Sequence, residues 1–69
     1  MLTRVIEKYR KHAPRGRVLR VLEAMHHAGV EDAGCNLSAD PPCWWMIWQG
    51  KLYERRSLRE LEMVIEQKQ

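Results

Sequence analysis

The sequence lacks any long apolar run, and no segment approaches the roughly 18 uninterrupted apolar residues of a membrane-spanning helix. It also lacks an export signal, since its first residues carry charges at Arg4, Glu7 and Lys8. A chain of 69 residues is too short for a two-domain enzyme, because a domain of this size buries only about 60% of the surface that its unfolded form exposes. We therefore expect one small cytoplasmic domain.

Cysteine is scarce, and the two that occur, Cys35 and Cys43, are expected to stay free thiols because no export signal leads to an oxidising compartment. With His12, His26 and His27 they include the ligand types of a zinc site, but neither a Cys-x-x-Cys nor a His-x-x-x-His spacing occurs. No nucleophile with a positioned base is evident either. We expect no metal, no cofactor and no enzymatic activity.

The composition is that of a folded chain, with 45% hydrophobic and 30% charged residues. Twelve Lys and Arg against nine Asp and Glu give a formal charge of +3, a mild excess that is compatible with an acidic partner.

Two segments of the N-terminal half have apolar residues at helical spacing, which predicts helices over 2–12 and 15–28. Pro14 ends the first, and Gly29 is typical of the position just past the second. Because the linker is short, the two helices should form an αα-hairpin. The apolar positions are Leu2, Val5, Ile6, Tyr9 and Ala13, then Val18, Val21, Leu22, Met25 and Ala28.

Gly, Asn, Ser, Asp and Pro accumulate in the next segment, 29–42, and predict a loop. An aromatic run from Cys43 then predicts a β-hairpin over 43–55 that turns at Gln49-Gly50. Ser57 and Glu60 have the spacing of a capping box, which predicts a helix over 58–67. The expected fold is a small α+β domain in the order α-α-β-β-α.

Both faces of this hairpin are apolar, whereas a hairpin with one face on the core usually has a polar second face. A two-residue turn places Trp45, Ile47 and Leu52 on one face. A three-residue loop ending at Gly50 would reassign one strand. With the two-residue turn, the opposite face carries Trp44, Met46, Trp48 and Tyr53, flanked by Lys51 and Arg55.

One interpretation buries every hairpin aromatic in the core. The other leaves a surplus for a partner, since Trp, Tyr and Arg are the commonest hot spots of protein interfaces. The candidate contact residues are then Trp44, Trp45, Trp48, Tyr53 and Arg55. A homodimer is favoured within this interpretation, because pairing two copies enlarges a core that is marginal alone.

A second hypothesis is a DNA-binding regulator in which Arg15, Arg17 and Arg20 contact phosphates. The segment 50–58 (GKLYERRSL) resembles the wing-to-helix segment of small excisionase and MerR-type winged-helix proteins. The resemblance covers about ten residues, and it implies a role for the hairpin as a wing. The same arginines are equally compatible with a solvated basic face balanced by Glu7 and Glu23.

In length, mild basicity, free cysteines and aromatic surplus, the chain resembles the small early proteins with which bacteriophages block host proteins, including the anti-activators of quorum sensing. The resemblance is one of type and rests on no particular residue. It implies a homodimer that occupies a host regulator, such as a transcription factor, and stops it from acting without any catalytic step.

Overall fold

A computed structural model describes residues 2–68 of the chain. This part contains three helices and one three-stranded antiparallel sheet with the strand order β1-β2-β3. The elements are α1 (Leu2–His12), α2 (Arg17–His27), β1 (Asp32–Asn36), β2 (Cys43–Trp48), β3 (Lys51–Arg55) and α3 (Leu58–Lys68).

Helices α1 and α2 form the predicted αα-hairpin, and α1 has the predicted bounds. Helix α2 begins two residues later than predicted, because Gly16 takes an extended conformation (φ −74°, ψ 153°) as its N-cap. It ends at His27, and Gly29 follows with φ 89°, a left-handed conformation that glycine adopts without strain.

The segment 29–42 is not a loop throughout, because it contains the strand β1. This strand pairs antiparallel with β2, with Ala33 opposite Met46 and Gly34 opposite Trp45. Just before it, the Glu31 N–H donates to the Ile47 carbonyl oxygen at 2.8 Å. The predicted order α-α-β-β-α is therefore corrected to α-α-β-β-β-α, and the α+β class is confirmed.

The hairpin of β2 and β3 turns on two residues, Gln49 (φ 54°) and Gly50 (φ 76°). Positive φ at both positions is what a type I′ turn requires, and this turn matches the twist of the flanking strands. It sets Trp48 opposite Lys51.

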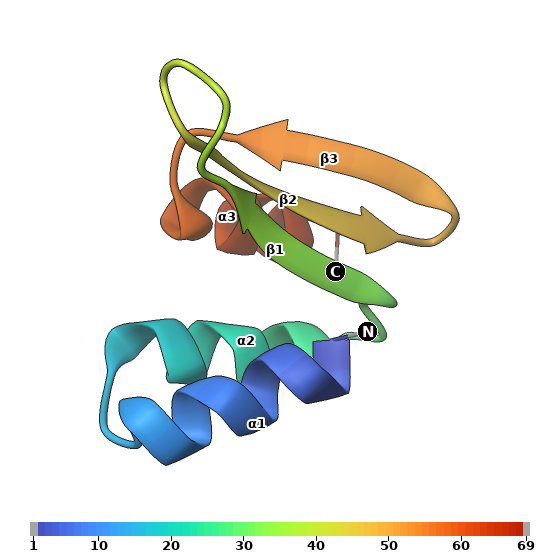
Figure 1. Ribbon diagram of the computed structural model, residues 1–69. Helices are drawn as coiled ribbons and strands as arrows, with labels where there is room; N and C mark the ends of the chain where they lie inside the picture. Colours follow the sequence, from blue (N-terminus) through green and yellow to red (C-terminus); the bar gives the residue numbers. More distant parts are fainter. Residues whose placement is uncertain (1, 69) are drawn as a thin grey trace.

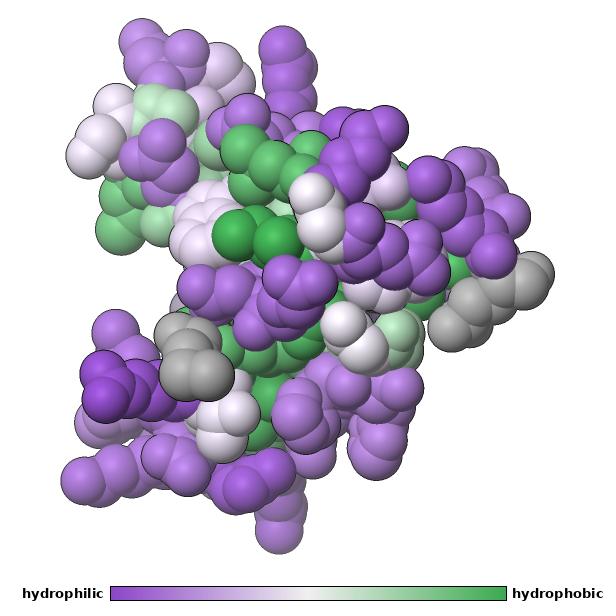
Figure 2. All heavy atoms as spheres, turned by 90° about the vertical axis from the view of Figure 1, so that its right-hand side faces the viewer, coloured by the Kyte–Doolittle hydropathy of each residue, from purple (hydrophilic) through white to green (hydrophobic). Residues whose placement is uncertain are grey.

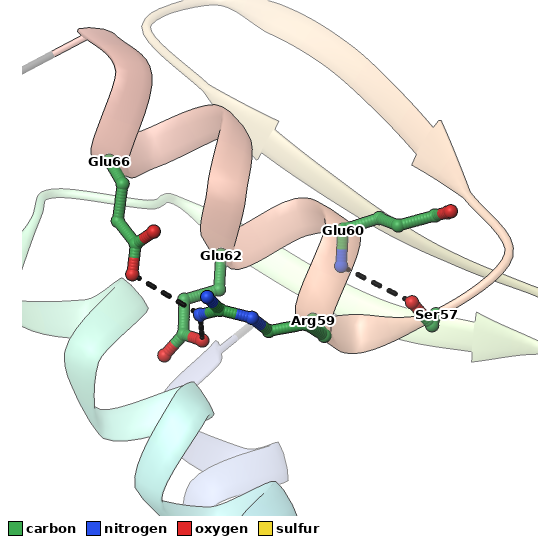
Figure 3. Close-up of polar contacts among 5 residues, drawn as sticks. All are labelled: Ser57, Arg59, Glu60, Glu62 and Glu66. Carbon is green, nitrogen blue, oxygen red and sulfur yellow. Dashed lines mark hydrogen bonds and ion pairs between the residues drawn. The ribbon is translucent and has the colours of Figure 1, made fainter.

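Helix α3 starts with a variant of the predicted capping box, shown in part in Figure 3. The Glu60 N–H donates to Ser57 Oγ at 3.2 Å, as expected. The Glu60 carboxylate, however, accepts from the N–H of Arg56 at 3.1 Å, one residue before the cap. The helix ends at Lys68, one residue beyond the prediction.

The core lies between the helices and one face of the sheet. In Figure 1, α3 runs behind the sheet, and α1 and α2 lie beneath its β1 edge. The contacts agree with this view, because α3 packs on β2 and β3, α1 packs on β1, and α2 joins the two other helices. Side chains from both layers are fully buried at the centre, including Leu22, Met25, Met46 and Leu61.

Candidate functional site

The register of the sheet divides its residues between two faces, and it confirms the division predicted for a two-residue turn. The face toward the helices carries Ala33, Cys35, Trp44, Met46, Trp48, Lys51, Tyr53 and Arg55. The opposite face carries Asp32, Gly34, Asn36, Cys43, Trp45, Ile47, Leu52 and Glu54. No helix or strand within residues 2–68 packs over this second face, which we call the open face.

Two of the predicted contact residues, Trp48 and Tyr53, belong to the core. Trp48 is 3% exposed and donates its indole N–H to the Ala28 carbonyl oxygen at 3.1 Å. Tyr53 is 7% exposed, and its hydroxyl accepts from Nζ of Lys68 at 2.8 Å. The helices thus cover both side chains, which leaves them little accessible surface in the folded chain.

The surroundings of Tyr53 are cationic. The hydrogen bond from Lys68 lowers the pKa of Tyr53 below its ordinary value, although burial of the ring opposes this. The charges of Lys68, Lys51 and Arg55 act in the same direction as the hydrogen bond. The ammonium groups of Lys51 and Lys68 also lie 5.5 and 5.2 Å from the ring centroid, within cation–π range.

Trp44 and Arg55 are cross-strand partners on the same face as Trp48. Trp44 is half-buried against the edge of the core. Arg55 is exposed and donates from Nη1 to the Glu54 carbonyl oxygen at 2.7 Å. These two residues therefore lie at the margin of the helix-covered face and not with Trp45.

The centre of the open face consists of Trp45, Ile47 and Leu52. Leu52 is 56% exposed, while Trp45 and Ile47 are half-buried by their neighbours. The ring of Trp45 lies across Gly34, where an added Cβ would be 2.8 Å from Cζ2 of the indole. A side chain at this position would therefore force the indole or the strand to shift.

The polar residues of the open face surround this apolar centre. Asp32 and Glu54 are acidic, and none of the paired residues on this face is Lys or Arg. Cys43 lies beside Glu54, with Sγ 4.0 Å from Oε2. Figure 2 shows apolar side chains exposed between hydrophilic ones in the upper half of the molecule, which is the half that contains the sheet.

The sequence pattern places Ile47 and Leu52 beside Trp45, although neither is among the predicted contact residues. The signal was present, because the two-residue turn at Gln49-Gly50 already assigned them to one face. The sequence does not indicate which face of the hairpin the helices cover, because both faces are apolar.

The three arginines of the DNA-binding hypothesis are all exposed. Arg15 lies in the turn before α2, and Arg17 and Arg20 lie in its first two turns. Nearby, Nη2 of Arg10 is 3.5 Å from Oε2 of Glu23, which joins α1 to α2.

The cysteines and histidines do not converge. Cys35 and Cys43 are free thiols, and the register puts them on opposite faces of the sheet. The rings of His26 and His27 are 6.3 Å apart in an edge-on arrangement. Among residues 2–68, no three His, Cys, Asp or Glu side chains are grouped to hold a metal ion.

None of the helices described here has the length and apolar character needed to cross a membrane. No protein-family model, curated protein or solved structure matches the chain.

Proposed function

We propose that the chain is a non-enzymatic protein-binding module of the cytoplasm. It forms a homodimer through the open face and acts by occupying a host protein such as a transcriptional regulator. The observation that carries the proposal is the open face, where Trp45, Ile47 and Leu52 form a contiguous apolar group over which no described element packs. On a small protein, exposed groups of this kind usually mark an interaction site.

The accessible surface of the chain supports pairing with a second copy. It measures 5108 Å², whereas a folded monomer of 8.2 kDa is expected to expose about 4500 Å². If a dimer contact covered this excess of accessible surface on both copies, it would bury about 1200 Å² in total. That area is at the lower end of the range for specific protein interfaces. A second sheet stacked on the open face would supply such cover, since sheets pack face to face about 10 Å apart.

The open face lends itself to this contact because the ring of Trp45 lies close to the sheet. Trp45 lies down on Gly34 and does not project, so a sheet of the same shape can approach. The acidic residues Asp32 and Glu54 lie on the two edge strands, opposite Ile47 and Trp45, so the polar groups of the contact belong to its rim.

A pair of matched variants tests the dimer. Leu52→Glu places a charge in the open face, and Leu37→Glu places the same charge on the β1–β2 loop, where the leucine is 79% exposed. By sedimentation, the native protein and Leu37→Glu should be dimers and Leu52→Glu a monomer with an unchanged circular dichroism spectrum. A native monomer, or a dimer of Leu52→Glu, would refute the proposal.

The host protein is identified by capture from host lysate with tagged protein after nuclease treatment. We expect a discrete host protein that survives the nuclease and is not captured by an unrelated basic protein of the same size. Recovery of nuclease-sensitive material only would favour DNA binding instead.

A DNA-binding role is the second candidate, because Arg15, Arg17 and Arg20 are exposed and none forms an ion pair with another residue of 2–68. Three phosphate contacts predict that the logarithm of the binding constant falls with the logarithm of salt concentration with a slope of about −3. Affinity for duplex DNA that is absent or insensitive to salt would exclude this role.

A further inference from the structure

A groove runs between α2 and α3, on the side of the molecule away from the open face. It consists of two adjoining hollows of about 430 and 420 Å³, and Glu62 lines both. The lining is mixed. Buried or half-buried apolar side chains form the floor, with Met25, Ala28 and Ile65 in one hollow and Val18, Val21 and Leu58 in the other, and charged side chains form the rim.

The groove has the length of a short helix. Its lining residues extend along α2 from Arg17 to the C-cap residue Ala28, which corresponds to about 16 Å at the 1.5 Å rise of a helix. An amphipathic helix of about three turns fits such a groove by laying its apolar side chains between the two walls.

The charges along the groove are not evenly distributed. On α3, Arg59 is bound by Glu62 and by Glu66, the latter at 3.3 Å, on the side that faces α2 (Figure 3). The hydrogen bond to Glu62 and the charge of Glu66 raise the pKa of Arg59. Two carboxylates thus surround one guanidinium, so the Arg59 charge is more than balanced within the chain and the α3 side of the groove carries a net negative charge.

Arg17 and Arg20 line the same hollow from α2 and are exposed. Neither forms an ion pair with any residue in 2–68. This end of the groove thus presents two cations beside an apolar floor, and a ligand that complements it needs both carboxylates and apolar side chains.

From this arrangement we infer that the groove takes an amphipathic helix of a partner protein, with the acidic residues of that helix against Arg17 and Arg20. The inference rests on the proposed protein-binding function and names the chemistry of the segment that is bound.

A second copy of this chain does not offer that segment. Helix α1 has no acidic residue in its first turn and carries Arg10, Lys11 and His12 in its last. Helix α3 is richer in glutamate, but Leu58, Leu61 and Ile65 are already buried in its own core. The occupant is therefore a different protein.

The probe is a fluorescein-labelled peptide of Ala, Leu and Glu, with leucines along one helical face and glutamates at one end of it. A second peptide has Lys in place of Glu, and a third has the first composition in scrambled order. By fluorescence anisotropy, the acidic peptide should bind at least tenfold more tightly than the other two.

Two double variants locate the site. Arg17→Glu with Arg20→Glu should weaken binding of the acidic peptide about tenfold or more, because two attractive charges become repulsive. Arg4→Glu with Lys8→Glu changes the net charge equally on the exposed side of α1 and should have little effect. In the native protein, the methyl resonances of Val18 and Val21 should shift on titration.

The inference is overturned if the acidic peptide binds more weakly than about 1 mM, if both double variants weaken binding equally, or if the peptide shifts resonances of the open face only. Duplex DNA binding that is lost in Arg17→Glu with Arg20→Glu, without peptide binding, would also overturn it. The dimer test with Leu52→Glu is independent, so failure of the groove leaves the open-face proposal standing.

Discussion

The indole of Trp45 lies against Gly34 so closely that a methyl group at residue 34 would come within 2.8 Å of the ring carbon Cζ2. Contacts this short do not persist in folded proteins, and the ring is packed on the strand backbone. This contact therefore packs β1, which no sequence pattern predicts to be a strand, against the aromatic strand β2.

Gly34→Ala is expected to destabilise the fold by about 1–3 kcal/mol, because the ring has to leave β1 or the strand has to move. Urea unfolding followed by circular dichroism measures this cost. In the background of Trp45→Leu, the same change should cost much less. An equal cost in both backgrounds would show that Trp45 is not the neighbour that excludes a side chain.

Trp48→Phe should lower the free energy of unfolding by about 1–3 kcal/mol, because it removes the indole N–H that satisfies the Ala28 carbonyl oxygen. Trp44→Phe is the matched control on the same face, since its indole nitrogen has no hydrogen bond within residues 2–68. The prediction fails if the two substitutions lower the urea midpoint equally.

Ser57→Ala should cost about 1 kcal/mol, because the Glu60 N–H loses its acceptor at the start of α3. Ser38→Ala, in the exposed loop between β1 and β2, should change stability little. Thermal unfolding of the two variants beside the native protein measures the difference. Equal melting temperatures for the two variants would argue that Ser57 does not cap the helix.

Tyr53 should ionise at a lower pH than an ordinary tyrosine, chiefly because Lys68 donates a hydrogen bond to its oxygen. A pKa that folding lowers makes the folded state more stable above the ordinary value of about 10, and this gain is lost as the pH falls through the pKa of the folded state. Absorbance titration in a Tyr9→Phe background follows Tyr53 alone.

In the same titration, Lys68→Met should raise the pKa of Tyr53, and Lys51→Met should raise it less, since Lys51 acts only through its charge. If Lys68→Met leaves the titration curve in place, the hydrogen bond is not what lowers the pKa.

The helices and the hairpin were predictable from sequence because their signals are local. Apolar spacing, Pro14, Ser57 and the Gln49-Gly50 turn each act within a few residues. Strand β1 offers no such signal: Asp32–Asn36 has no β-branched or aromatic residue. It is a strand because β2 presents a free edge and because Gly34 gives room to Trp45.

The candidate surface was predictable only in part, because it depends on how the helices pack on the sheet. The alternation of residues along β2 and β3 by itself assigns Trp45, Ile47 and Leu52 to one face. It could not show that α3 would cover the other face and bury Trp48 and Tyr53. Which face of the sheet is covered depends on the direction that α3 takes after the turn at Arg56 and Ser57. No local sequence pattern determines this direction.

The placement of Cys35 and Cys43 on opposite faces of one sheet has a practical consequence. Their side chains project in opposite directions, so oxidation cannot join them without rearranging the strands. Each can instead be alkylated by itself, and Cys43 would report on the open face while Cys35 serves as an internal reference. Peptide mass spectra of protein alkylated with and without a partner then show which of the two cysteines, and so which side of the sheet, has been covered.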